Sequence, residues 1–226
     1  MRRFIIIAAF LALFTSAALA ANAVWDVPAG GNCDTSFTRS NANLTVTSSV
    51  GLWRSCRATT SHSTGKYFLR YTVIASSNQT LWLSGFENSS ADTANYPGST
   101  GSTGIGCQGA AAGSGAYFGT TGGDANCGNG NFGSAIVEYA IDLDAKKIWI
   151  RIPANSSQWN HSATADPATG TNGATYSISG ALFPACGAHD AAGNGCVLDT
   201  TGGTPPSGFL VWDVPAHQAS GWTLMK

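Results

Sequence analysis

Apolar and polar positions alternate along most of the chain, and this alternation predicts short β-strands. The clearest pair forms a hairpin, with strands at residues 135–143 and 147–152 around a turn at 144–146. Both strands are rich in β-branched and aromatic residues, which favour a pleated, partly buried surface. A long polar loop follows the hairpin, and an apolar strand at 181–188 then returns the chain to the sheet.

The first half of the chain contains further strands of the same kind. Alternating segments are expected at residues 43–47, 52–57, 66–75 and 81–87. Residues 76–78 read as a turn, so the last two segments are predicted to pair as a hairpin. Because both of these strands are apolar on their two faces, they are expected in the centre of a sandwich.

Two loop regions separate the strands. Residues 88–133 are rich in Gly, Ser, Thr and Ala, with possible strands only at 104–108 and 116–119, and residues 154–173 form a second polar loop. No segment between residue 21 and the end shows a capped helical pattern with a 3.6-residue period. The sequence therefore predicts an all-β domain whose long loops carry function.

Composition narrows the class of protein. Only 10% of the residues are charged, against about 25% in typical soluble domains, and the formal net charge is −1. A chain without an excess of basic residues lacks the electrostatic footprint of a nucleic-acid-binding protein, so no nucleic-acid partner is expected.

The first twenty residues have the pattern of a secretory signal peptide. Arg2 and Arg3 precede an apolar run at residues 4–14, and Ala18-Leu19-Ala20 fits a cleavage site. The apolar run is too short to cross a membrane, and no later segment is long enough either, so no membrane span is expected. We expect cleavage near Ala20, a secreted product (extracellular, at the cell surface or in the periplasm), and one domain over residues 21–226.

All six cysteines follow the predicted signal peptide, and an even count in an exported chain predicts disulfides. Pairing between sequence neighbours is the simplest of the fifteen possible connectivities. A zinc site is the alternative, but the spacing of cysteines and histidines does not match one, so no metal or cofactor is expected. The expected pairs are Cys33–Cys56, Cys107–Cys127 and Cys186–Cys196.

The order of motifs along the chain resembles that of SPRY domains, most closely those of bacterial and phage-associated proteins. The match covers roughly residues 25–209. It departs from the family before the closing proline motif, where residues 199–203 replace the usual Asn-Phe-Gly, and residues 210–226 form a C-terminal extension. The motifs that carry the resemblance are Arg57-Ala58-Thr59-Thr60, residues 63–68, Asn95-Tyr96-Pro97-Gly98, Gly104-Ile105-Gly106, the hairpin, loop and strand start at 135–185, and Pro205-Pro206-Ser207-Gly208-Phe209.

This resemblance implies a concanavalin-like, jelly-roll β-sandwich of two antiparallel sheets. SPRY domains generally act as binding modules that present loops to a protein partner, and related concanavalin-type sandwiches bind glycans. The resemblance therefore implies a secreted, non-enzymatic recognition module for an extracellular protein or a cell-surface glycan.

Aromatic residues in the polar loops are the candidate ligand contacts. An exposed ring beside polar side chains can stack on a sugar or anchor a protein partner. For each ring, packing within its own loop is the competing interpretation, and tryptophans within strands, Trp53 among them, are expected in the core. The candidates are Tyr96, Tyr117, Trp159, Asn160 and Asp166.

No catalytic constellation stands out, so no catalytic residues are assigned. Glu138 and Asp142 lie on one predicted strand and are the best pair for an alternative function, a polysaccharide-active enzyme. The competing interpretation of Asp142 and Asp144 is that they stabilise a hairpin turn. A second alternative is a structural surface protein that assembles through its edge strands. The sequence Val-Trp-Asp-Val-Pro-Ala occurs twice, at residues 24–29 and 211–216, and we expect these two ends of the chain to lie together as similar edge segments, unless the repeat is a coincidence.

Overall fold

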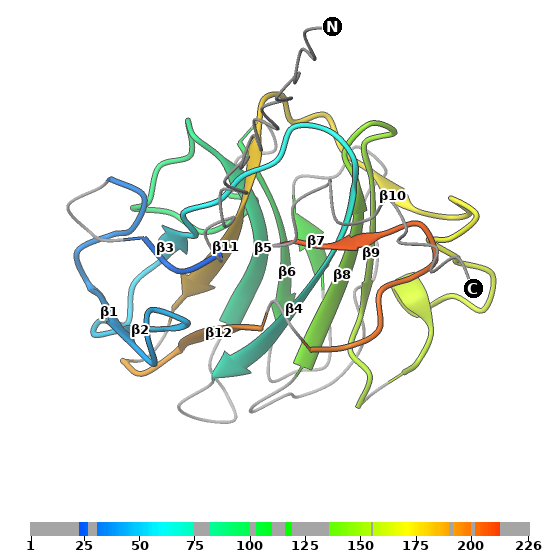
Figure 1. The fold of residues 1–226 in the computed structure, drawn as a ribbon. Helices are drawn as coiled ribbons and strands as arrows, with labels where there is room; N and C mark the ends of the chain where they lie inside the picture. Colours follow the sequence, from blue (N-terminus) through cyan, green and yellow to red (C-terminus); the bar gives the residue numbers. More distant parts are fainter. Residues whose placement is uncertain are drawn as a thin grey trace, which may run out of the picture.

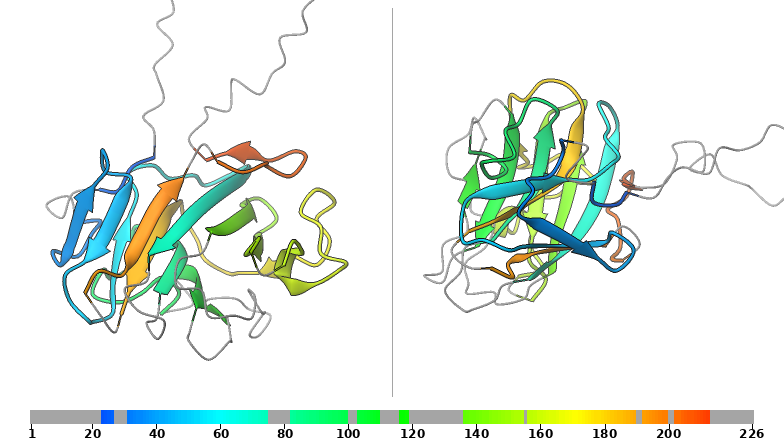
Figure 2. Two further views of the ribbon diagram at one scale, coloured as in Figure 1. Left: turned by 90° about the horizontal axis from the view of Figure 1, so that it is seen from below. Right: turned by 90° about the vertical axis from the view of Figure 1, so that its left-hand side faces the viewer.

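The computed structural model describes residues 23–26, 31–74, 82–99, 103–109, 116–118, 136–154, 156–189, 192–199 and 202–212. Two β-sheets are stacked face to face (Figures 1 and 2). Apart from one short parallel pairing, all neighbouring strands described are antiparallel, so the predicted all-β sandwich is confirmed.

The larger sheet has eight strands. Seven follow one another across the sheet in the order β1 (Phe37–Ser40), β2 (Thr45–Ser48), β12 (Gly195–Asp199), β4 (Lys66–Ile74), β8 (Ile136–Asp142), β9 (Lys147–Arg151) and β10 (Ala174–Thr175). The eighth, β13 (Leu210–Val211), pairs in parallel with β4 at Tyr67 and Phe68. It follows β12 along the same edge of β4, because β12 uses positions 70–74 of that strand.

The smaller sheet has five strands, in the order β3 (Arg54–Arg57), β11 (Leu182–Ala188), β5 (Trp82–Asn88), β6 (Gly104–Gly109) and β7 (Ala116–Phe118). The short strands β6 and β7 fall where the sequence allowed strands within the first loop region. A 3-10 turn, Trp159–His161, is the single helical element among the described residues, and no helix there has the length and apolar character needed to cross a membrane.

The predicted hairpin at residues 135–152 is confirmed as β8 and β9, with Tyr139 opposite Ile150. Its inward face joins the main core between the sheets, whereas Ala140 and Trp149 face outward. Asp142 accepts a hydrogen bond from the amide of Ala145 at 2.8 Å, so its predicted role in the turn is also confirmed.

Buried tyrosine hydroxyls connect the two sheets across the core. Tyr71 of β4 donates to the carbonyl of Gly85 in β5 at 2.7 Å and accepts from the amide of Ala185 in β11 at 3.1 Å. Tyr139 of β8 lies 2.7 Å from the hydroxyl of Ser84 in β5. Burial raises the pKa of both tyrosines, so they stay neutral hydrogen-bonding groups.

The predicted β4–β5 hairpin is wrong. β4 pairs with β12 and β8 in the larger sheet, and β5 lies between β11 and β6 in the smaller one. Both strands are central, as expected from their apolar faces, but the same two-faced pattern fits a crossover between sheets as well as a hairpin. Periodicity alone therefore could not choose the partner.

Disulfides tie the N-terminal segment to the sandwich and join its two sheets. Cys33–Cys56 ties the N-terminal segment to β3, and Cys186–Cys196 joins β11 of one sheet to β12 of the other, which confirms two predicted pairs. Cys107 is also disulfide-bonded, and its predicted partner Cys127 lies outside the described residues.

The described parts of the repeated segments lie on the same side of the sandwich in Figure 2. Trp25 and Trp212 are both 1% exposed in the main core. The segments are bonded to different strands, however: Trp25 bridges Ala58, and Val211 pairs with β4.

Candidate functional site

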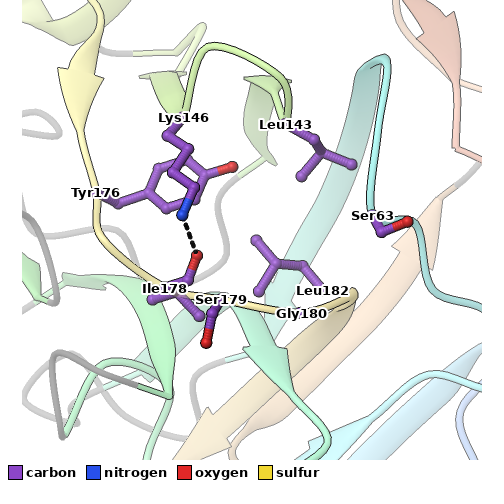
Figure 3. A pocket seen from close by; sticks show the side chains of 8 residues that line it. All are labelled: Ser63, Leu143, Lys146, Tyr176, Ile178, Ser179, Gly180 and Leu182. Carbon is purple, nitrogen blue, oxygen red and sulfur yellow. Dashed lines mark hydrogen bonds between the residues drawn. The ribbon is translucent and has the colours of Figure 1, made fainter.

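Strand β11 connects two surface features. At its first residue, Leu182, a pocket opens near the β8–β9 turn (Figure 3). At its other end, Ala188 leads to His189, which belongs to an aromatic group on the surface. Seven residues of extended strand rise about 20 Å, so the two features are well separated.

The aromatic group, called here the Trp53 cluster, consists of Trp53, Tyr96 and His189. The Trp53 and His189 rings are stacked with centroids 3.8 Å apart, and the Trp53 and Tyr96 rings are tilted with centroids 4.4 Å apart. All three residues are half-buried. Leu52, next in the chain to Trp53, is 52% exposed.

Three separate segments form the cluster. Trp53 immediately precedes β3 and His189 immediately follows β11, and these strands pair with Arg54 opposite Ala188. Tyr96 comes from the loop at residues 89–99, which follows β5. The antiparallel pairing therefore fixes Trp53 and His189 side by side, and only Tyr96 depends on a loop.

Glycines in the sheet allow that loop to lie directly on it. A Cβ atom at Gly106 would overlap the carbonyl oxygen of Pro97, and one at Gly187 would lie 2.8 Å from Cδ of Pro97. A Cβ at Gly104 would lie 2.7 Å from the amide nitrogen of Gly98. Pro97 and Gly98 thus pack where side chains would stand, and this packing positions the adjacent Tyr96.

One backbone and one side-chain hydrogen bond hold the same loop along β3. The amide of Ser55 donates to the carbonyl of Thr93 at 2.9 Å, and Nη1 of Arg54 donates to the carbonyl of Ala94 at 3.3 Å. Nε of Arg54 also lies 3.2 Å from a carboxylate oxygen of Asp34.

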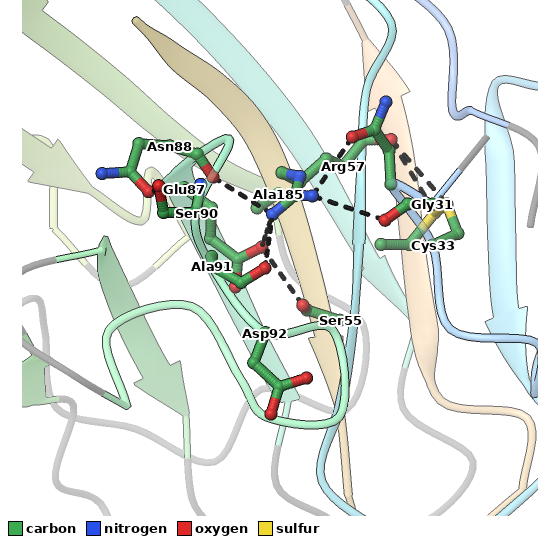
Figure 4. Close-up of polar contacts among 12 residues, drawn as sticks. Gly31, Cys33, Ser55, Arg57, Glu87, Asn88, Ser90, Ala91, Asp92 and Ala185 are labelled. Carbon is green, nitrogen blue, oxygen red and sulfur yellow. Dashed lines mark hydrogen bonds and ion pairs between the residues drawn. A yellow bond between two sulfur atoms is a disulfide. The ribbon is translucent and has the colours of Figure 1, made fainter. Parts of the chain in front are cut away.

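A buried polar network lies at the start of the loop (Figure 4). Nη1 of Arg57 donates to the carbonyls of Asn88 and Ala91 at 3.1 and 2.9 Å, and Nη2 donates to Oδ1 of Asn32 at 3.1 Å. Glu87 is 1% exposed; its Oε2 accepts from Ser55 Oγ at 3.1 Å and lies 3.8 Å from Nη1 of Arg57. The guanidinium therefore joins the loop to both β3 and β5.

Burial raises the pKa of Glu87 to about 8, and the nearby Arg57 cation and Ser55 hydroxyl offset only part of that rise. The folded state then binds a proton that the unfolded chain releases between about pH 4.5 and pH 8. Glu87 therefore does not lower the free energy of unfolding below about pH 4.5. It lowers this free energy increasingly between about pH 4.5 and pH 8, and the decrease is complete above pH 8.

We expect Glu87 to make the free energy of unfolding fall as pH rises from 5 to 8, by up to about 1.4 kcal/mol per pH unit. Urea unfolding at several pH values measures this slope, and the variant Glu87→Gln, which cannot ionise, should flatten it. Equal slopes in the two proteins would show that Glu87 does not titrate there.

The predicted ligand contact Trp159 is buried, with 9% of its surface exposed. It packs in a second apolar cluster with Phe68, Trp149 and Phe209, and the guanidinium of Arg151 lies 4.3 Å from its ring centroid. The expectation of an exposed ring is wrong for this residue, because its loop folds back onto the outer face of β4, β8 and β9.

Asn160 and Asp166 organise the same loop. Oδ1 of Asn160 accepts from the amide of Ile150 at 2.8 Å, and its amide group donates to the carbonyls of Ile148 and Asn172. Asp166 accepts from the amide of Ala168 at 2.9 Å and so stabilises a turn. These bonds give both side chains a local structural role.

Tyr117 lies in β7, at the edge of the smaller sheet, and its side chain is outside the described part of the structure. Of the three predicted aromatic contacts, Trp159 is buried and the side chain of Tyr117 is not described, whereas Tyr96 is partly exposed.

The alternative catalytic pair does not line an open groove. Glu138 and Asp142 are 5% and 4% exposed; Glu138 pairs with Nε of Arg151 at 2.6 Å and Asp142 with Nζ of Lys66 at 3.0 Å. Carboxylates engaged in this way are held as structural ion pairs, which argues against a catalytic role for them. Within the described residues, no group of three or more His, Cys, Asp or Glu side chains is placed to hold a metal ion.

Sequence reasoning missed Trp53 and His189. Trp53 was expected in the core because it lies within the predicted strand at residues 52–57, but β3 begins one residue later, at Arg54. His189 carried no pattern at all. The available sequence signal for this site was the pair of motifs Tyr96-Pro97-Gly98 and Gly104-Ile105-Gly106. These two segments pack against each other and so position Tyr96.

No protein-family model matches the chain. No curated protein sequence matches it either. Among solved structures, the SPRY domain of human HERC1 is similar with a TM-score of 0.54 and 13% identity, over 79% of this chain and 99% of that one. The PSpry domain of TRIM65 is similar with a TM-score of 0.53 and 14% identity, over 79% of this chain and 92% of that one. The chain therefore has a SPRY-like fold, as its motifs predicted.

Proposed function

We propose that the chain is an exported, non-enzymatic recognition module that binds a protein partner through the Trp53 cluster. The observation that carries this proposal is the preassembled, partly exposed group of Trp53, Tyr96 and His189. Tryptophan and tyrosine are enriched in the few residues that supply most of the affinity of protein interfaces.

Two features favour a protein over a glycan. One face of Trp53 is covered by the stacked His189 ring, so that face is not open as a platform for a sugar. Leu52, the residue before Trp53 in the chain, is exposed and offers apolar surface that a protein partner can bury. Because the cluster is already packed, binding loses little side-chain entropy.

Export is supported by the signal-like N-terminus and by the disulfides. Bonds such as Cys33–Cys56 and Cys186–Cys196 persist in oxidising compartments. The SPRY-like fold agrees with recognition through loops, because the loop at residues 89–99 presents Tyr96 from a rigid sheet.

Tyr96→Ala and Trp53→Ala should each weaken partner binding by about 30-fold or more, as loss of a central interface residue does. The oxidised chain, its variants and the control Ala168→Ser would be immobilised and exposed to surface extracts of the producing cells. Support requires a protein retained by the wild type and by the control, lost with both variants, and then bound with these affinities when purified.

A glycan array is run beside the capture experiment. A glycan whose binding is lost in Tyr96→Ala would show that the cluster binds a sugar and would contradict the proposal. Unfolding curves of the variants separate loss of the site from loss of the fold.

A further inference from the structure

The side chains of Arg57 and Glu87 meet at the start of the loop that carries Tyr96 (Figure 4). A guanidinium has five N–H donors, and each Nη atom carries two of them. Both hydrogens of Arg57 Nη1 are used by the loop, because this atom donates to the carbonyls of Asn88 and Ala91. The same atom lies 3.8 Å from Oε2 of Glu87, which is beyond hydrogen-bond distance. Nη1 therefore bonds to the loop and not to the carboxyl group.

The remaining donors of Arg57 are not bonded to Glu87 either. Nη2 donates to Oδ1 of Asn32 at 3.1 Å and to the carbonyl of Gly31 at 3.5 Å, and Nε has no acceptor among the described residues. The carboxyl group of Glu87 accepts from the hydroxyl of Ser55 at 3.1 Å. This arrangement suits a neutral, protonated carboxyl group, which needs fewer donors than a carboxylate.

Ionisation of Glu87 changes which acceptor Nη1 of Arg57 prefers. A buried carboxylate attracts a cationic donor more strongly than a neutral carbonyl oxygen does, because opposite charges interact strongly where water is excluded. Asn88 is the last residue of β5, so its carbonyl is fixed by the sheet, whereas Ala91 lies in the loop. Ala91 is therefore the acceptor that can move away when Nη1 turns to Glu87. Asp92 follows it directly, and its negative charge would repel an ionised Glu87.

The groups around Glu87 allow its charge to change in the folded protein. Burial raises the pKa of Glu87 to about 8, the Arg57 cation and the Ser55 hydroxyl lower it, and Asp92 raises it. Tyr71 of β4 also interacts with Glu87, but it stays neutral because burial raises its own pKa well above the usual value. The residues opposite Glu87 on the two neighbouring strands are uncharged: Phe183 of β11 and Gly104 of β6. The carboxyl group is thus neutral below about pH 8 and ionised above it.

We propose that Glu87 and Arg57 form a proton-controlled switch for the loop at residues 89–99. With Glu87 neutral, Nη1 of Arg57 holds the carbonyl of Ala91, and the loop keeps Tyr96 against Trp53. When Glu87 gives its proton to solvent water, Nη1 turns to the carboxylate, the carbonyl of Ala91 is released, and Tyr96 is less tightly fixed.

The consequence for recognition rests on the proposed function. A protein partner that needs the assembled Trp53 cluster should bind more weakly above pH 8 than below pH 7. The expected change is about 3- to 10-fold, which corresponds to the loss of one hydrogen bond.

The test follows carbon signals of the labelled, oxidised chain between about pH 5 and pH 9.5, with no partner present. The chain has two glutamates, Glu87 and Glu138, so labelled glutamate carboxyl carbons give two signals, and Glu87→Gln identifies one of them. We expect the carboxyl carbon of Glu87, the carbonyl carbon of Ala91 and the ring carbons of Trp53 to change with one midpoint above pH 7. In Glu87→Gln, the signals of Ala91 and Trp53 should keep their low-pH positions throughout.

Ser55→Ala removes the hydroxyl that donates to Glu87 but keeps the amide that donates to Thr93. Because this hydroxyl stabilises the ionised form, the transitions of Glu87 and Ala91 should move together to higher pH. The control Ser90→Ala, at an exposed serine of the same loop, should move neither.

The switch is overturned if Glu87 shows no transition in this range, or if the Ala91 carbonyl keeps one position while Glu87 titrates. It is also overturned if Ala91 responds equally in Glu87→Gln, or if Ser55→Ala separates the two transitions. None of these signals requires a partner, so a failed search for a partner would count against the proposed function alone.

Discussion

Arg57→Met is expected to lower the free energy of unfolding by about 2–5 kcal/mol, because each buried carbonyl left without its donor costs about 1–3 kcal/mol. The methionine keeps the aliphatic stem but leaves the carbonyls of Asn88 and Ala91 without their donor. It also leaves the buried Glu87 without its neighbouring cation, so the pKa of Glu87 should rise further.

The matched control is Arg54→Met, which breaks an ion pair with Asp34 whose side chains are 26% and 20% exposed. Partly exposed pairs contribute little, so a loss of less than about 1 kcal/mol is expected there. Urea unfolding of both variants at pH 6 measures the difference. Similar losses in the two variants would mean that the Arg57 network does not hold the structure together.

Gly106→Ala is expected to displace the loop at residues 89–99 and so disrupt the Trp53 cluster. The added methyl group would overlap the Pro97 carbonyl oxygen. Because this oxygen belongs to the backbone, either β6 or the loop must shift to relieve the overlap. Overpacking of this kind typically costs about 1–3 kcal/mol. Faster hydrogen exchange at the amide of Ser55, which donates to Thr93, would report the displaced loop.

Gly208→Ala is the control for this variant. Gly208 has a φ of +83° but open space around it, so its replacement adds backbone strain without a clash. It should cost about 1 kcal/mol and leave the exchange of Ser55 unchanged. If Gly106→Ala also left that exchange unchanged, the proposed seating of Pro97 on the sheet would be wrong.

The positions of most strands could be predicted because alternating apolar residues and turn residues are local features of the sequence. The β8–β9 hairpin combines alternating apolar positions with an Asp-stabilised turn, and both features are local. The β4–β5 assignment failed because sheet partnership depends on distant segments: β12 and β8 supply the neighbours of β4 from more than sixty residues away in the chain.

The candidate site was only partly predictable for the same reason. Tyr96 stood in a recognisable polar loop, but its neighbours Trp53 and His189 are brought to it by the pairing of β3 with β11. Trp159 has the same local sequence character as Tyr96, yet Arg151 and the second apolar cluster cover it. Whether a loop aromatic faces solvent depends on where its loop packs, and local sequence does not specify that.

Photo-cross-linking tests the role of the Trp53 cluster most directly. A benzophenone amino acid would replace the exposed Leu52, next in the chain to Trp53, in one sample and the exposed Ala168 of the other long loop in a second, each mixed with surface extract and irradiated. The account predicts a discrete protein adduct from position 52 that is absent from position 168 and lost when Trp53→Ala is added. No adduct at position 52, or the same adduct from both positions, would contradict the assignment of this cluster as the binding site.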